Sequence, residues 1–221
     1  MSDFKSDLVT DNVSGMGVSE RVNLSITDIS KNEKLSPKII IFGGVNGAGK
    51  TSLYEVMSRT ENFGKRISVD EIVAAEGSWK DPIIQIRAAK LAKKLIDRYI
   101  ENKESFHFES TLTGKVVLRQ LEKARENGFS VTLYFVGVDG IDTAIERVER
   151  RVKNGGHGID TKAIITRYNA MKENLRRILG ACDEIYFYDN TARFRQIAIH
   201  KSGKILDEDP ILPEWYLDTF R

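Results

Sequence analysis

The chain has 221 residues, of which 41% are hydrophobic, and this size and composition suit one α/β domain with modest additions. Its 34 Lys and Arg nearly balance its 32 Asp and Glu, which argues against a protein that holds nucleic acid by bulk charge. The single cysteine, Cys182, excludes an intramolecular disulfide framework and fits a reducing compartment. The N-terminus does not have the form of a signal peptide and no apolar run reaches spanning length, so we expect a cytoplasmic protein with neither nucleic-acid nor membrane partners.

Residues 1–36 are polar with scattered apolar positions, and we expect a flexible N-terminal extension there. Residues 37–221 are expected to form the folded domain. Lys38 to Phe42 is a short β-branched apolar run, typical of a buried parallel strand.

A glycine-rich segment with the spacing G-x-x-x-x-G-K-[ST] follows this strand and precedes an expected helix: Gly44-Val45-Asn46-Gly47-Ala48-Gly49-Lys50-Thr51. Strand, glycine loop and helix start form the context that a phosphate-binding loop requires. The glycines let successive backbone N–H groups point at phosphate oxygens, and the helix N-terminus adds partial positive charge. In such a loop Lys50 reaches the β- and γ-phosphates and the Thr51 hydroxyl is a ligand of Mg²⁺.

The rest of the chain alternates strands and helices. A second strand, 66–70, ends in Asp70, and a third, 105–109, ends in Glu109. The other expected elements are helix 82–102 after an Asp81 cap, helix 114–127, strand 130–138, helix 142–153, a helix from Asp160 to Gly180, strand 184–188 and a hairpin over 196–206.

This alternation predicts a P-loop kinase type of α/β fold: a parallel five-stranded sheet with helices on both faces, a helical lid around 150–167 and a C-terminal hairpin. Ligands of such sheets bind beyond the carboxyl ends of the strands. The phosphate loop, Asp70 and Glu109 all lie at such ends, so we expect them to converge.

Other classes of phosphate-loop protein carry segments that are absent here. The nearest string to the N-K-x-D of GTPases, Asn102-Lys103-Glu104-Ser105, lacks the aspartate, and the L-S-G-G of transport ATPases does not occur. The strand of a motor ATPase ends in Asp-Glu, whereas the candidate strand here ends in Glu109-Ser110. A small-molecule kinase remains, and its ATP site is predicted at Gly44, Val45, Asn46, Gly47, Ala48, Gly49, Lys50, Thr51 and Ser52.

A kinase also needs a group that takes the acceptor proton. We expect Asp70 to be this base, the alternative being a helix N-cap. Glu109 is expected to bind a substrate hydroxyl or to hold Mg²⁺ through water, the alternative being an ordinary strand-end carboxylate.

A kinase further needs cations on the migrating phosphoryl group and a lid that excludes water. Arg151 and Arg167 flank the loop 154–158, each on its own helix, which suits a lid that closes over ATP. The alternative is that both are solvated, the fate we expect for the remaining arginines of these helices: Arg147, Arg150, Arg176 and Arg177.

An ordered set of segments resembles the zeta-toxin family of bacterial P-loop kinases, in its compact branch. The segments are Gly44–Thr51, Ser68-Val69-Asp70-Glu71-Ile72, Phe108-Glu109-Ser110-Thr111-Leu112, Arg151-Val152-Lys153-Asn154-Gly155-Gly156-His157, Arg167-Tyr168 and Tyr188-Asp189-Asn190-Thr191.

The resemblance implies ATP-dependent phosphorylation of the 3′-hydroxyl of the amino-sugar in UDP-N-acetylglucosamine. It assigns the base to Asp70, substrate binding to Glu109 and Thr111, and contacts with ATP phosphates to Arg151 and Arg167. It also implies a small protein antitoxin as partner. Two alternatives stay open: a kinase for another nucleotide, such as a nicotinamide dinucleotide, and a non-catalytic ATP-binding regulatory module.

Overall fold

The computed structural model describes residues 36–221, which form one compact unit. The predicted N-terminal extension, 1–36, therefore lies almost entirely outside the described residues. None of the described helices is long and apolar enough to cross a lipid bilayer.

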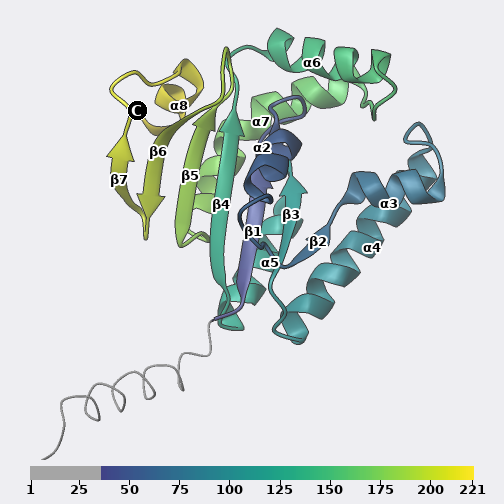
Figure 1. Ribbon diagram of the computed structural model, residues 1–221, viewed down its shortest axis with the longest axis horizontal. Helices are drawn as coiled ribbons and strands as arrows, with labels where there is room; N and C mark the ends of the chain where they lie inside the picture. The colour runs from purple at the N-terminus through teal and green to yellow at the C-terminus, as the bar shows by residue number, and fades with distance from the viewer. Residues whose placement is uncertain (1–35) are drawn as a thin grey trace, which may run out of the picture. The chain divides into compact units, whose positions relative to one another are not determined.

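One mixed sheet runs through the unit in the order β2-β3-β1-β4-β5-β6-β7 (Figure 1). Its strands are β1 (Lys38–Gly43), β2 (Lys65–Ile67), β3 (Phe106–Ser110), β4 (Ser130–Gly137), β5 (Glu184–Asp189), β6 (Arg195–Lys201) and β7 (Lys204–Glu208). The first five pair in parallel, as predicted. The expected sheet of five strands is corrected to seven, because the C-terminal hairpin pairs its β6 antiparallel with β5 and so continues the sheet.

Seven helices connect and cover these strands within the described residues. They are α2 (Lys50–Met57), α3 (Val69–Glu76), α4 (Pro82–Glu101), α5 (Lys115–Glu126), α6 (Ile141–Lys153), α7 (Thr161–Leu179) and α8 (Glu214–Phe220). The expected caps of α4 and α7 are present, since Asp81 accepts from the N–H of Ile83 and Asp160 from that of Lys162. The helices α3 and α8 were not predicted.

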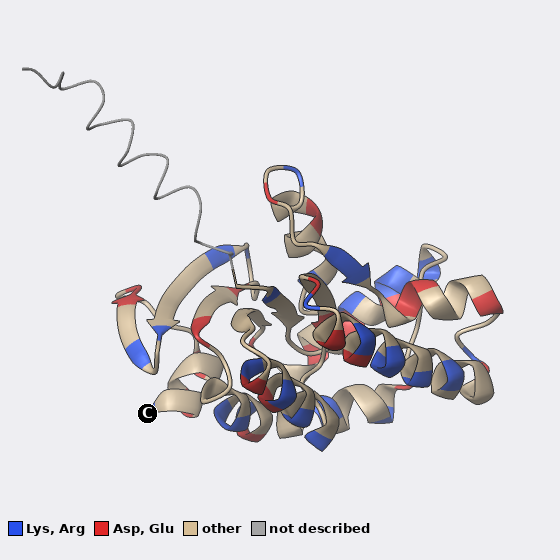
Figure 2. Cartoon of the chain, turned by 90° about the horizontal axis from the view of Figure 1, so that it is seen from below, with Lys and Arg blue, Asp and Glu red and all other residues tan. Residues whose placement is uncertain are grey.

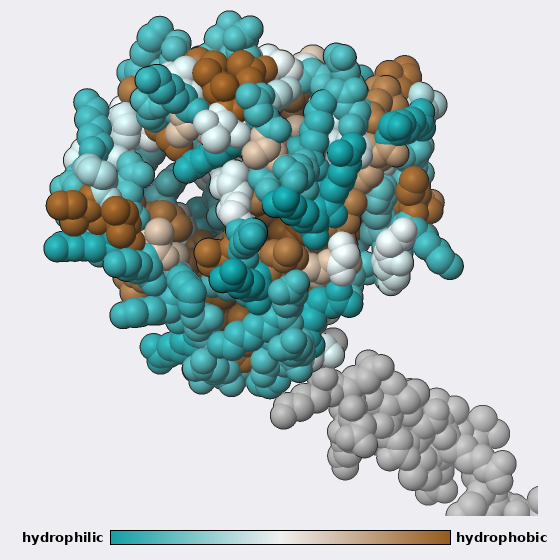
Figure 3. Space-filling view, turned by 180° about the vertical axis from the view of Figure 1, so that it is seen from behind, coloured by the Kyte–Doolittle hydropathy of each residue, from teal (hydrophilic) through white to brown (hydrophobic). Residues whose placement is uncertain are grey.

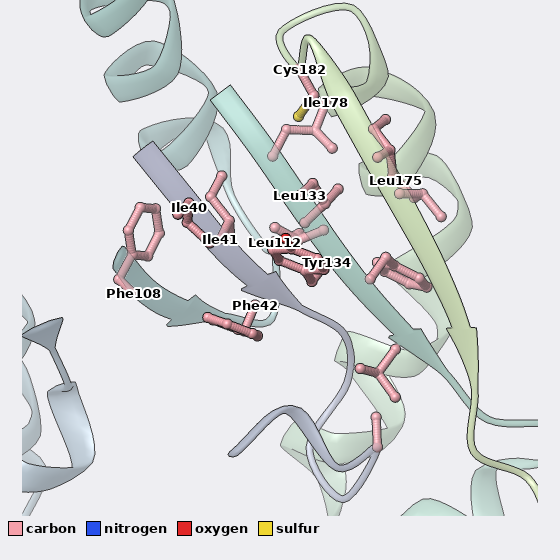
Figure 4. Packing of buried hydrophobic residues seen from close by; sticks show 14 of the residues in the cluster. Ile40, Ile41, Phe42, Phe108, Leu112, Leu133, Tyr134, Leu175, Ile178 and Cys182 are labelled. Atoms are coloured by element: carbon pink, nitrogen blue, oxygen red, sulfur yellow. The ribbon is translucent and has the colours of Figure 1, made fainter. Parts of the chain in front are cut away.

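The sheet is covered on both faces. On one face Phe42 of β1 packs edge-on against Tyr54 of α2, with ring centroids 5.5 Å apart. On the other, Phe106 of β3 packs against Tyr99 of α4, with centroids 5.7 Å apart. Figure 4 shows the close packing of this core around β1 and β4, where alternate side chains point to opposite faces.

The predicted strand 66–70 is wrong in its second half. Strand β2 ends at Ile67. The next residue, Ser68, is still extended, and its side-chain hydroxyl accepts a hydrogen bond from the backbone N–H of Glu71. This N-cap starts α3 at Val69, so Asp70 lies in the first helical turn and not at a strand end. The serine cap satisfies free N–H groups at the start of α3, and β2 ends three residues before the predicted end.

Candidate active site

The phosphate loop connects β1 to α2 and depends on glycine at the crowded positions. Gly47 has φ 80° and Gly49 has φ 106°, values that side chains other than glycine's rarely adopt. A Cβ on Gly47 would lie 2.5 Å from the carbonyl oxygen of Ala144, at the start of α6. The loop backbone therefore packs directly on the backbone of α6 at Gly47. The loop ends at the N-terminus of α2, where free backbone N–H groups can bind phosphate.

Lys50 occupies the first turn of α2, and its ammonium donates to the carbonyl of Val45 across the loop at 3.0 Å. Burial removes water from the ammonium and lowers the pKa of Lys50 to about 8, although Glu109 and Asp70 oppose the shift. Arg151 and Arg167 lower it further by charge repulsion. The two predicted carboxylates and the two predicted lid arginines thus all act on one buried ammonium.

Glu109 lies beside the phosphate loop, since it pairs in register with Phe42 at the end of β1. One of its carboxylate oxygens, Oε2, accepts from the hydroxyl of Thr51 at 2.8 Å. The other, Oε1, lies 3.6 Å from the guanidinium of Arg66. Thr51, the predicted Mg²⁺ ligand, and Glu109, the predicted substrate-binding residue, are therefore in direct contact.

Arg66 was not predicted as a site residue, although it lies four residues before Asp70, in strand β2. Its guanidinium also pairs with Glu71 at 2.9 Å and stacks over the ring of Tyr54, 4.3 Å from its centroid. It thereby joins β2, α2 and α3 around Glu109. A lone arginine in a short strand carries no signal of this kind, because its partners come from three separate elements.

Asp70 is exposed in the first turn of α3 and does not cap this helix, since Ser68 does. Its charge acts both on Lys50 and on Arg167, whose pKa is lowered by burial and raised again by Asp70. Asp70 is therefore exposed to solvent and close enough to the phosphate loop for its charge to act on Lys50. Thr111 lies one residue beyond β3, and its hydroxyl pairs with that of Thr113 at 2.9 Å. Ser52 is exposed in the first turn of α2.

The lid brings its two arginines to the phosphate loop. Arg167 of α7 donates to the side-chain carbonyl of Asn46 at 2.9 Å. Arg151 is at the end of α6; its Nε is buried and, within residues 36–221, has no hydrogen-bond partner. Nε2 of His157, in the lid loop, is also buried and has no hydrogen-bond partner among the described residues.

The lid loop also touches the loop between α3 and α4. A Cβ on Gly158 would lie 2.5 Å from a ring carbon of Trp79 and 2.8 Å from a methyl of Val152. The lid loop and the loop between α3 and α4 are therefore in contact. Figure 3 shows an opening at the left of the view, on the side of the molecule that carries α3 and α4.

A second group of contacts lies on the opposite side of the phosphate loop, after β5. The amide of Asn190 donates to the carbonyl of Ala48 at 2.8 Å, and the ring of Phe194 lies against Gly49. The expectation that Arg147 is a solvated surface residue is wrong: it is half-buried and donates to the carbonyl of Thr191 at 3.0 Å. It turns inward because its position on α6 faces the end of β5.

Charge is otherwise spread over the outside of the unit. In the view of Figure 2, Lys and Arg are interspersed with Asp and Glu along the outer helices. This is the pattern expected from 34 basic and 32 acidic residues.

Comparison with known proteins gives a family and a fold. Residues 23–202 match the family model described as Zeta toxin. An uncharacterized protein of Haemophilus influenzae is 30% identical over 132 residues, which are 59% of this chain and 92% of that protein.

Solved structures share the fold at low identity. A structure of the PezAT chromosomal toxin-antitoxin system of Streptococcus pneumoniae matches with TM-score 0.53 and 17% identity, over 94% of this chain and 88% of that one. The AvrRxo1-ORF1:AvrRxo1-ORF2 complex matches with TM-score 0.65 and 12% identity, over 91% of this chain and 69% of that one; a structure of that complex with ATP gives TM-score 0.59. A chain of the Pnkp1/Rnl/Hen1 RNA repair complex gives TM-score 0.55 and 17% identity, and this chain spans 48% of its length.

The family match covers most of the described unit, and the loop, the lid and the parallel sheet are those of a P-loop kinase fold. The chain belongs to the zeta toxin family.

Proposed function

We propose that this protein is an ATP-dependent kinase that transfers the γ-phosphoryl group of ATP to a hydroxyl of a nucleotide-sugar, with UDP-N-acetylglucosamine as the first candidate. The observation that carries the proposal is the gathering of charged side chains at the phosphate loop. Glu109 contacts Thr51, Arg167 contacts Asn46, and the charges of Glu109, Asp70, Arg151 and Arg167 all act on Lys50. Membership of the zeta toxin family supports the same class of reaction.

In this mechanism the phosphate loop and Lys50 hold the β- and γ-phosphates of ATP. Asp70 accepts the proton of the acceptor hydroxyl as its oxygen attacks the γ-phosphorus. The bond between that phosphorus and the β–γ bridging oxygen breaks, ADP leaves, and the acceptor carries the phosphoryl group. Arg151 and Arg167 stabilise the charge on the migrating group, and the lid that carries them excludes water.

Mg²⁺ fits the residues present. The Thr51 hydroxyl and the Glu109 carboxylate lie 2.8 Å apart beside the loop, and they can hold the ion directly or through water. The described residues contain no group of three or more acidic, His or Cys ligands, but a kinase site needs only one or two carboxylates because substrate phosphates and water supply the rest. When bound, the ion neutralises charge that develops on the β- and γ-phosphates.

Two features around α3 support an anionic, ring-bearing acceptor. Arg66 is a partly exposed cation whose partner Glu71 is itself solvent-exposed, so a diphosphate could replace that carboxylate. Trp79 lies where the loop between α3 and α4 meets the lid loop. These contacts favour a nucleotide over a simple sugar.

The acceptor can be identified by incubating the protein with a metabolite pool, ATP and Mg²⁺, followed by mass spectrometry. The proposal expects UDP-N-acetylglucosamine to gain one phosphoryl group. A gain on a nicotinamide dinucleotide would assign the alternative kinase. No phosphorylated product with intact ATP binding would favour a non-catalytic module.

Asp70→Asn tests the base. We expect transfer to fall by at least about 100-fold while ATP affinity stays within about 2-fold, because Asp70 meets the acceptor and not the loop. Glu71→Gln is the matched control, since it neutralises the adjacent carboxylate, which pairs with Arg66. Equal losses in both variants would contradict the assignment of the base.

A protein antitoxin is the second partner that we propose. The support is the family together with the PezAT toxin-antitoxin structure. Co-expression with the product of a neighbouring gene, followed by affinity purification, tests it: a stoichiometric complex that blocks transfer is expected.

A further inference from the structure

We propose that the C-terminal helix α8, through Trp215, is a positioning element for the nucleoside end of ATP. It holds the segment 189–194 against the phosphate loop. The inference rests on the ATP site of the proposed function. It is independent of which acceptor receives the phosphoryl group.

Trp215 is 2% exposed and packs directly on Gly137 at the end of β4, where there is no space for a Cβ. Its indole N–H donates to Oδ1 of Asp189, the last residue of β5, at 3.1 Å. The same carboxylate oxygen accepts from the hydroxyl of Thr191 at 2.7 Å. One buried carboxylate thus ties the helix to the segment that follows β5.

Asp139 makes a second connection between the same parts. Its carboxylate accepts from the backbone N–H groups of Trp215 at 2.8 Å and Glu214 at 3.3 Å, and so caps the start of α8. Its own backbone N–H donates to the hydroxyl of Thr191 at 2.9 Å. Thr191 is therefore held from both sides by groups that also hold α8.

The segment after β5 transmits this placement to the phosphate loop. The Asn190 backbone N–H donates to the carbonyl of Gly137, and its side chain donates to the carbonyl of Ala48. The ring of Phe194 lies against Gly49 and is 37% exposed, so one part of it faces solvent beside the loop.

The sheet order assigns this side of the loop to the nucleoside. Asp70 and Glu109 come from β2–α3 and β3, on one side of β1, and mark the γ-phosphate end. The triphosphate must therefore extend toward β4 and β5, where Asn190 and Phe194 lie. The partly exposed ring of Phe194 suits stacking against a base.

Helix α8 also lies outside the residues that the family model matches. The family match ends at residue 202, whereas α8 spans Glu214–Phe220. The segment that it holds, 189–194, lies inside the match. In this chain a part beyond the family region therefore braces a part within it.

Trp215→Phe tests the inference, because it keeps an aromatic ring at this buried position and removes the indole N–H together with part of the fused ring. Tyr216→Phe is the matched control on the same helix: its hydroxyl contacts His200 at 2.8 Å and Glu208 at 2.7 Å, away from the ATP side. Calorimetry with ATP should show the dissociation constant of Trp215→Phe raised by about 5- to 10-fold, the size of the net contribution of one typical hydrogen bond. Tyr216→Phe should lower the melting temperature and leave ATP affinity unchanged.

Thr191→Val adds a readout that a general loss of stability does not change. If Trp215 and Thr191 both act through the Asp189 carboxylate, their effects should not add. The variant that combines Trp215→Phe with Thr191→Val should then bind ATP as well as the single variant that has the lower ATP affinity. In turnover assays KM for ATP should rise for Trp215→Phe, with kcat and the acceptor KM unchanged.

Unchanged ATP affinity in Trp215→Phe would overturn the inference, as would equal losses in Trp215→Phe and Tyr216→Phe or additive losses in the double variant. These results leave the proposed function intact, since wild-type protein would still bind and use ATP. Wild-type protein that binds no ATP would overturn both.

Discussion

The depressed pKa of Lys50 predicts that ATP affinity falls steeply in mildly alkaline solution. An ordinary lysine, with a pKa of about 10.5, stays charged up to pH 9.5. With a pKa of about 8, about three-quarters of the Lys50 side chains are protonated at pH 7.5 and about one-thirtieth at pH 9.5. Because the triphosphate binds the charged form, affinity is greatest below pH 8 and should fall by about 20-fold between these two values.

The sign of the effect follows from linkage. Bound phosphate stabilises the ammonium and raises the pKa of Lys50, so binding above pH 8 must take up a proton. Calorimetry in two buffers with different ionisation enthalpies measures this uptake directly. The expected value rises from near zero well below pH 8 toward one proton per site at pH 9.

Lys50→Arg is the control, because a guanidinium stays charged through this range. Its ATP affinity can be lower at every pH, but it should be flat between pH 7.5 and 9.5 without proton uptake. A wild-type affinity that is equally flat would show that burial does not control the charge of Lys50. The interpretation that Glu109, Asp70, Arg151 and Arg167 all act on a buried Lys50 ammonium would then be wrong.

Two glycines give further predictions. Gly47→Ala should abolish measurable ATP binding and cost about 1–2 kcal/mol of stability, because φ 80° disfavours a side chain and a Cβ would lie 2.5 Å from the Ala144 oxygen; calorimetry and thermal unfolding check this. Gly158→Ala should separate the lid loop from Trp79 and raise the acceptor KM by about 3- to 10-fold with ATP affinity unchanged. Gly180→Ala, which meets no atom within 4 Å, is the control, and an equal change there would contradict this role of the lid contact.

The sequence alone was enough to predict those parts of the site whose residues are contiguous in the chain. The phosphate loop, with Lys50 and Thr51, is one segment whose glycines and flanks carry the whole signal. The caps of α4 and α7 are local as well, since Asp81 and Asp160 each bond an N–H two residues away. The residues that specify these features are therefore close to one another in sequence.

Asp70 shows where local reasoning failed. Two capping groups, Ser68 and Asp70, stand two residues apart after a short strand. The structure uses Ser68, which starts α3 before Asp70 and shortens β2. Both side chains are good caps, so the local sequence does not decide between them.

The contacts on the nucleoside side could not be predicted for another reason. Asn190 bonds Ala48 across 142 residues, and Trp215 bonds Asp189 only because β4 and β5 end side by side. Each residue type is ordinary in its own segment. Only the sheet order makes them neighbours, and periodicity predicts strands without predicting which strand ends meet.

The same distinction bears on how the site assembles. The loop that binds phosphate is complete in sequence at Ser52, yet its nucleoside side is braced by Asp139, Asp189 and Trp215. Contacts of such long sequence separation form only after the intervening chain is ordered, because closing the loop costs conformational entropy first. A chain that lacks α8 can therefore form the phosphate loop and still hold the segment 189–194 loosely. Its ATP affinity would then fall through lost order, with every residue that touches the phosphates still present.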